Sequence, residues 1–235
     1  VVIDSTKISA ISTDALAALT TANIASLTTA QAAALTTDQI YALTTSQMGA
    51  FATRDLAVLD TDQAAALTSD QISALSATQI AAISTDGISV FETGEIAALS
   101  TTQISALNTA QVAGLNTDQI SALTALQTVQ LKSAQVTSLS TIQIVALSTA
   151  ALAGLSVAGF AAISTAQISV MSTDQIAGLS TTQAAALSTS NIAALTTDQL
   201  ASMETADIAS LSLVGMAAIS TEQAISLTTT QVGAL

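Results

Sequence analysis

The chain has 235 residues and a formal net charge of −13, and its only basic residues are Lys7, Arg54 and Lys132. With so little positive charge to neutralise phosphate, nucleic acid and anionic membrane surfaces are poor partners. The absence of Cys excludes disulfides and thiolate sites, and the absence of His as well removes the usual nucleophilic pairs, so we expect no enzyme.

An eight-residue register runs along the whole chain. From Ile3 to Leu235 in steps of eight, all thirty positions are Leu, Ile, Phe or Met. A fixed period indicates one structural unit stacked many times. The sequence therefore predicts residues 1–235 to be a single continuous array of about 29 octads.

The octad at 35–42 shows how eight residues would form one unit. Its second residue, Thr36, belongs to the Ser, Thr, Asn and Asp class that caps helix starts, as it does in 25 of 29 octads. Gln39 follows three residues later, the spacing of a capping box, and 18 octads carry Gln there. Leu35 and Ile40 fall at the two ends of a hydrophobic staple. These signals predict a helix of about six residues in every octad.

The predicted fold is all-α, a solenoid or superhelix of short helices with one helix per octad. One continuous helix is excluded because eight residues exceed two turns, which would rotate the Leu row by about 80° per repeat. A β-solenoid remains an alternative, although Ala, Gln and Asp are poor strand formers. Leu, Ile and the small eighth residue are expected to form the inward face.

Departures from the consensus bear on how many octads close one coil. At the Gln position, Asn23, Asp55, Gly87, Ala151 and Gly215 all belong to one class modulo 32. This superperiod favours four octads per coil, and three per coil remains open.

Two surface rows could carry a function. Asp recurs at the fourth octad position, which suggests a calcium ladder or a simple interaction with the helix dipole. Thr fills the third position in 22 octads, and stacked Thr columns suggest binding to ice or another surface. We favour the structural explanation for both rows, and predict no catalytic, cofactor-binding or metal site and no cofactor. The Asp residues are Asp38, Asp62, Asp70, Asp86, Asp118, Asp174 and Asp198.

The octad that begins at Leu123 is the least regular. Leu126, Thr128, Val129 and Gln130 depart from the consensus together, which indicates a locally repacked coil or a partner contact. Gly87, Gly159 and Gly215 occupy the Gln position, where we expect them to relieve crowding because no Gly-rich loop surrounds them.

The octad at 171–178 and the following Leu read Met-Ser-Thr-Asp-Gln-Ile-Ala-Gly-Leu. This repeat resembles the octapeptide-repeat regions of very large secreted or surface proteins of Gram-negative bacteria, often described as adhesin-like. The resemblance covers the whole chain and implies an extracellular or cell-surface structural protein that could contact other surface proteins. It brings no site residues with it.

The array begins and ends in register without a polar capping unit, which suggests an excerpt of a longer or processed chain. Val1, Val2 and Ile3 open it, and Val232, Gly233, Ala234 and Leu235 close it. Open solenoid ends expose apolar edges, so we expect end-to-end self-association. No run of about eighteen apolar residues occurs, so no membrane insertion is expected.

The most economical function is therefore a structural one: an extracellular rod, stalk or filament subunit. The alternative is an ice- or surface-binding solenoid.

Overall fold

The computed structural model describes residues 4–235, in which each octad forms one short α-helix and no strand occurs. The chain divides into two compact units, Val1–Ala122 and Leu123–Leu235. Val1, Val2 and Ile3, for which an open apolar edge is expected, lie outside the described residues. The all-α prediction with one helix per octad is confirmed.

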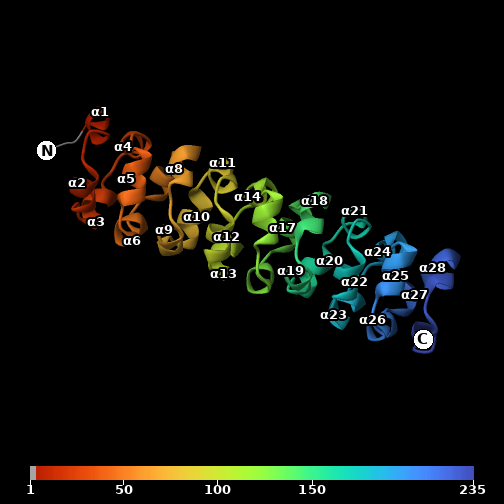
Figure 1. Ribbon diagram of the computed structural model, residues 1–235. Helices are drawn as coiled ribbons and strands as arrows, with labels where there is room; N and C mark the ends of the chain where they lie inside the picture. The colour runs from red at the N-terminus through yellow and green to blue at the C-terminus, as the bar shows by residue number, and fades with distance from the viewer. Residues whose placement is uncertain (1–3) are drawn as a thin grey trace. The chain divides into compact units, whose positions relative to one another are not determined.

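The first unit contains fifteen helices of four to six residues within its described part (Figure 1). They are α1 (Ser5–Ile8), α2 (Thr13–Ala17), α3 (Thr21–Ala25), α4 (Thr29–Ala33), α5 (Thr37–Ala42), α6 (Thr45–Gly49), α7 (Thr53–Leu56), α8 (Thr61–Ala65), α9 (Ser69–Ala74), α10 (Ala77–Ala82), α11 (Thr85–Ser89), α12 (Thr93–Ala98), α13 (Thr101–Ala106), α14 (Thr109–Gly114) and α15 (Thr117–Ser121).

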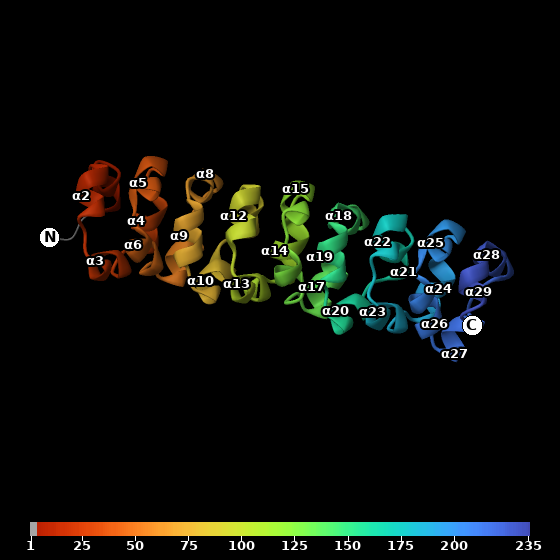
Figure 2. The same cartoon turned by 60° about the horizontal axis from the view of Figure 1, so that its bottom comes forward.

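The second unit contains fourteen helices of the same kind (Figure 2). They are α16 (Ala125–Thr128), α17 (Ser133–Ser138), α18 (Thr141–Ala146), α19 (Thr149–Ala153), α20 (Val157–Ala161), α21 (Thr165–Ile168), α22 (Thr173–Ala177), α23 (Thr181–Ala185), α24 (Thr189–Ala194), α25 (Thr197–Ser202), α26 (Thr205–Ser210), α27 (Leu213–Ala217), α28 (Thr221–Ser226) and α29 (Thr229–Val232).

Two extended residues separate one helix from the next. After α5, Leu43 has φ −62° and ψ 137°, and Thr44, the N-cap of α6, has φ −72° and ψ 157°. No residue from 4 to 235 has a positive φ, so the chain turns without left-handed backbone. This explains why a repeat with 29 helix ends needs only nine Gly and no Pro.

The helices pack in a regular order within each unit. Each helix lies against the third helix before it and the third after it, as α10 does with α7 and α13, and α25 does with α22 and α28. Hydrogen bonds from glutamine side chains instead reach the fourth helix back, as from Gln71 of α9 to Leu43, at the end of α5. One coil therefore holds between three and four octads. The sequence left both numbers open: three octads is the spacing of helices that pack together, and four octads is the spacing of the glutamine hydrogen bonds.

The core of each unit consists of the first and sixth residues of the octads. In α5 and its neighbours, Leu35, Ile40, Leu43 and Met48 are at most 4% exposed.

The eighth residue does not belong to this inward face, which corrects the expectation above: Ala42, for example, is only half-buried. The third buried row is the fifth octad residue, usually Gln, because its side chain bonds to the preceding coil. The small eighth residue still permits close packing, since a Cβ on Gly114 would lie 2.6 Å from Cγ2 of Thr85, in the third helix back.

Candidate functional site at the contacts between coils

Gln71 shows the contact that joins neighbouring coils. Its Oε1 accepts from the backbone N–H of Thr68, the N-cap of its own helix, at 2.9 Å. Its Nε2 donates to the carbonyl oxygens of Ile40 and Leu43, at 2.9 Å and 2.7 Å, at the end of the helix four octads earlier. One amide thus serves a helix start in one coil and a helix end in the next.

The same contact recurs in both units. We call the fifth octad residue the ladder position, because its Nε2 bonds to backbone carbonyls 28 to 31 residues earlier. The residues for which these bonds are seen are Gln39, Gln47, Gln63, Gln71, Gln79, Gln103, Gln111 and Gln119 in the first unit and Gln167, Gln175, Gln183, Gln199, Gln223 and Gln231 in the second. Asn191 does the same with the carbonyl of Ile163 at 2.8 Å.

Glutamine suits the ladder position for a chemical reason. The first free N–H groups and last free C=O groups of a short helix need partners, and a buried group without one costs about 1–3 kcal/mol. A primary amide offers an acceptor and two donors on one flat group. The sequence predicted the capping half of this role from the spacing. The bond to the coil below could not be seen in the sequence, because it depends on how many octads form a coil.

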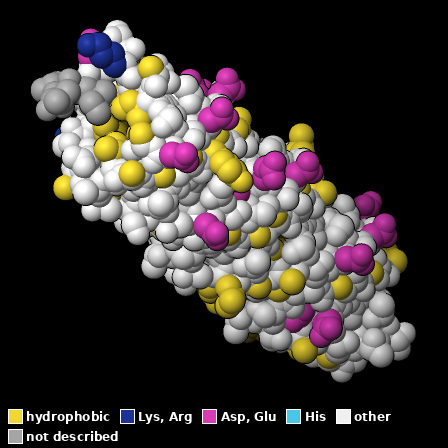
Figure 3. All heavy atoms as spheres, turned by 60° about the vertical axis from the view of Figure 1, so that its left-hand side comes forward, with side chains coloured by type: hydrophobic (Ala, Val, Ile, Leu, Met, Phe, Trp, Pro, Cys, Tyr) yellow, Lys and Arg dark blue, Asp and Glu magenta, His cyan; other side chains and the backbone are white. Residues whose placement is uncertain are grey.

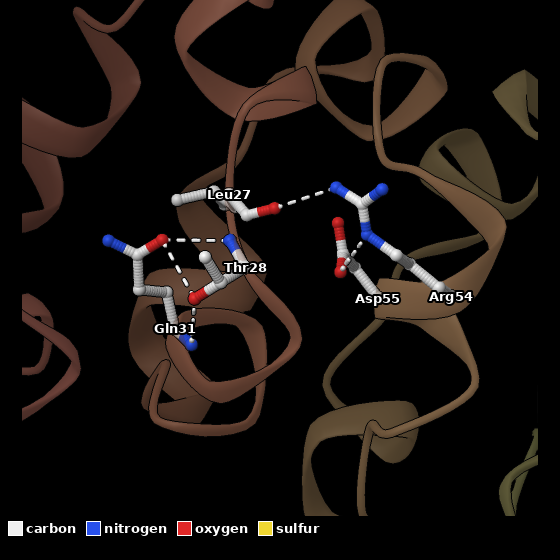
Figure 4. Close-up of polar contacts among 5 residues, drawn as sticks. All are labelled: Leu27, Thr28, Gln31, Arg54 and Asp55. Carbon is white, nitrogen blue, oxygen red and sulfur yellow. Dashed lines mark hydrogen bonds and ion pairs between the residues drawn. The ribbon is translucent and has the colours of Figure 1, made fainter.

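Arg54 and Asp55 replace the glutamine in one coil (Figure 4). Asp55 occupies the ladder position and is completely buried, and Nε of Arg54 lies 3.4 Å from its Oδ1. Nη2 of Arg54 donates to the carbonyl of Leu27 at 3.1 Å, so the guanidinium takes over the bond that a glutamine would make. Burial raises the pKa of Asp55, and the neighbouring Arg54 acts in the opposite direction.

The figure also shows the standard arrangement beside this exception. In α4, Oε1 of Gln31 accepts from the backbone N–H of Thr28 at 2.8 Å, and Oγ1 of Thr28 accepts from the backbone N–H of Gln31 at 3.3 Å. This is the capping box that the sequence predicts.

Gly87, Gly159 and Gly215 are buried at ladder positions. A Cβ on Gly87 would lie 2.9 Å from the side chain of Ile83, and one on Gly215 would lie 2.8 Å from that of Ile192. A Cβ on Gly159 would lie 3.2 Å from the hydroxyl oxygen of Ser156, so the predicted crowding is seen most clearly at Gly87 and Gly215.

The irregular octad is repacked around α16. Thr128 stands where other octads carry Ile, is completely buried, and its hydroxyl donates to the carbonyl of Ala151 at 2.6 Å. The close approach of α19 depends on Gly154, whose Cβ would lie 2.7 Å from backbone atoms of Ala125. Leu126 remains 75% exposed, so repacking accounts for Thr128 and leaves a partner contact at Leu126 open.

The acidic row lies on the surface. All eight Asp residues of the fourth octad position, the seven above and Asp14, are exposed in the first turn of a helix, where the dipole favours a negative charge. Figure 3 shows acidic side chains spaced over the face in view. Within residues 4–235, no three potential metal ligands of the His, Cys, Asp and Glu types are grouped so that they could hold a metal ion.

The Thr row faces another row. Thr85 and Thr149, at the third octad position, lie against the eighth-position residues Gly114 and Gly178 of the third helix onward. At both places a Thr side chain therefore lies against a small residue and not against another Thr. Separately, none of the helices between residues 4 and 235 is long and apolar enough to cross a membrane.

The chain matches the model of a known repeat family. The model of the ALTTAQ repeat matches residues 8–45, 42–77, 88–125, 149–181 and 158–189. These segments cover more than half of the chain, whereas no curated protein matches it. The tandem octads described above are repeats of this kind, and the chain belongs to the ALTTAQ repeat family.

Proposed function

We propose that this chain is a structural protein, an extracellular or cell-surface rod, stalk or filament subunit whose working part is the contact between coils. The main support for this proposal is which residues of the octad vary in sequence and which do not. The first and sixth residues, which make the core, are apolar in every octad except at Thr128, and Gln holds the ladder position in 18 of 29 octads, whereas the exposed fourth residue is Asp, Ala, Thr, Ser, Gly, Arg, Glu, Leu, Ile or Val in different octads. A surface that bound one ligand through the fourth residue would constrain that residue.

The proposed localisation has separate support. The resemblance to secreted adhesin-like repeat proteins points to the cell exterior. The chain also offers only three Lys or Arg residues, so few sites are open to trypsin-like proteases. A partner among other surface proteins and the absence of catalytic activity belong to the same proposal.

End-to-end association is the form of this proposal that can be tested directly. In the interior of each unit the sixth octad residue is fully buried, but in the last coil Val232 is 53% exposed and Ala224 is also exposed. A further coil, of the same chain or of a second copy, would cover these apolar side chains.

Sedimentation velocity over a concentration series, with negative-stain microscopy, tests this association. We expect oligomers that grow with concentration, and expect Val232→Asp to suppress them. Ile142→Asp is the matched control, because Ile142 is similarly exposed, at 69%, but lies on the side of a coil. A monomer at all concentrations, or equal suppression by both variants, would contradict the filament-subunit form.

The surface-binding alternative receives less support. A flat Thr array needs Thr to stack on Thr, whereas Thr85 and Thr149 lie against Gly114 and Gly178 of the third helix onward. Thermal hysteresis or ice shaping by the purified chain would favour this alternative over the structural one.

A further inference from the structure

Two ladder positions hold a carboxyl group without a neighbouring cation. Glu95 in α12 is 8% exposed and Asp207 in α26 is 2% exposed. Oε2 of Glu95 accepts from the backbone N–H of Glu92 at 2.8 Å, as Oε1 of a ladder glutamine does. The second oxygen of Glu95 then corresponds to the NH2 group of a glutamine. Oδ2 of Asp207 is buried and has no hydrogen-bond partner among the described residues.

These carboxyl groups occupy a place built for a donor. In the other coils, ladder side chains donate to the carbonyls 31 and 28 residues earlier. For Glu95 those carbonyls belong to Ala64 and Leu67, and for Asp207 to Ile176 and Leu179. A carboxylate can only accept, and so can a carbonyl, so the ionised side chain repels the end of the helix below. A neutral carboxylic acid carries one donor and one acceptor, the pattern of the amide.

The surroundings favour the neutral form. Burial raises the pKa of Glu95, and the Glu92 carboxylate adds to this effect while the Glu92 N–H opposes it. The helices that pack against α12 are α9 and α15, and α8 is the fourth helix back, at the distance that ladder side chains reach. The charged groups of these helices, with the N-cap of α8, are Asp60, Asp62, Asp70 and Asp118.

Asp207 lies in a similar environment. Burial raises its pKa, a hydrogen bond with the Thr181 side chain opposes the change, and the charge of Glu204 adds to it. The helices that pack against α26 are α23 and α29, which contain no titratable residue, and α22, the fourth helix back, contributes the exposed Asp174. Neither carboxyl group therefore has a neighbour like Arg54, which serves Asp55.

We propose that Glu95 and Asp207 are proton-binding sites, at which a bound proton restores the donor that links one coil to the next. Each unit contains one such site, so both units become more stable as the surroundings become acidic. Because the folded state holds these protons more tightly than the unfolded chain, the added stability is greatest at low pH. It is lost as the pH rises from the ordinary range of Glu and Asp, about 4, through the raised pKa values.

Denaturant unfolding at about pH 5.5 and about pH 7.5 tests the proposal, since both values lie above the ordinary pKa of carboxyl groups. The natural chain is expected to unfold at a higher denaturant concentration at the lower pH. Glu95→Gln with Asp207→Gln restores the consensus, so it should raise the midpoint at the higher pH and reduce the difference between the two pH values. The reverse change, Gln103→Glu, should lower the midpoint at the higher pH and enlarge that difference.

The control must separate these sites from the general effect of net charge. Asp38→Asn with Glu222→Gln removes the same two charges from exposed positions on α5 and α28, which do not pack against α12 or α26, and should leave the pH difference in place. The proposal is overturned if this control and the Glu95/Asp207 variant reduce the difference equally. It is also overturned if calcium chloride at the higher pH stabilises the natural chain but not the Glu95/Asp207 variant, because the carboxylates would then hold a cation.

Discussion

At the scale of single residues, the ladder glutamine accounts for most of the polar chemistry inside the chain. The repeat buries an amide in nearly every coil, and burial of a polar group is tolerated only when its hydrogen bonds are made. Gln71 makes bonds to Thr68, Ile40 and Leu43. The amide therefore fixes the distance between coils as well as the start of a helix.

Gln71→Ala should lower the free energy of unfolding of the protein by about 1–3 kcal/mol, because it leaves the N–H of Thr68 and the carbonyl of Leu43 without these partners. Asp70→Ala, one residue earlier and exposed, should change it by less than about 0.5 kcal/mol. Chemical denaturation followed by circular dichroism measures both. Equal effects of the two substitutions would show that the ladder does not stabilise the stack.

Arg54→Ala should destabilise the coil around α7, because Asp55 would remain buried without its cation and Leu27 would lose its donor. The second variant, Arg54→Ala with Asp55→Gln, restores the consensus residue and should recover most of the loss. Thermal unfolding of the two variants and the natural chain distinguishes these outcomes. Failure of the second variant to recover stability would mean that the Arg54–Asp55 pair acts in another way.

At the scale of the helix, four to six residues are too few for independent stability, so each helix depends on its caps and on its neighbours. In α22, Oγ of Ser172 accepts from the N–H of Gln175 at 3.1 Å, and the Gln175 side chain bonds both to Ser172 N–H and to the Leu147 carbonyl. The cap and the coil contact thus share one residue.

Ser172→Ala alone should cost about 1 kcal/mol, the usual value of an N-cap. Adding Gln175→Ala should cost clearly more than the cap itself, because the bonds to Ile144 and Leu147 are lost as well. Denaturation of the single and double variants gives both values. If the second substitution added nothing, the glutamine would serve only as a cap.

Helix positions could be predicted from the sequence because they are set by local signals, as the Thr36 and Gln39 spacing shows. The burial of the eighth residue was predicted wrongly, because the angle between a helix and its coil decides which side chains face inward. The number of octads per coil also could not be predicted from signals within one octad. It follows from the contacts of Gln71 with the end of α5, 28 positions earlier, and of α10 with α13, about 24 positions later.

At the scale of the whole molecule, contacts that repeat at fixed sequence distances make the register itself a structural requirement. Deletion of residues 171–178 removes one whole octad and keeps Leu, Gln and Ile in phase. Deletion of residues 171–174 moves every later ladder residue of that unit out of phase.

We expect the eight-residue deletion to retain helical circular dichroism and cooperative unfolding, and the four-residue deletion to lose both in the second unit. Limited proteolysis under the same conditions reports the loss independently. Equal tolerance of the two deletions would contradict a stack held by register.

The central claim is that glutamine side chains are buried donors between coils, and the exchange of their side-chain amide protons with water tests it most directly. Gln130, at the eighth octad position, is exposed and provides an internal reference that Gln130→Ala identifies in the spectrum of a glutamine-labelled sample. Nuclear magnetic resonance should show slow exchange for interior ladder residues such as Gln71 and Gln175, and fast exchange for Gln130. Exchange of Gln71 and Gln175 as fast as that of Gln130 would contradict the account.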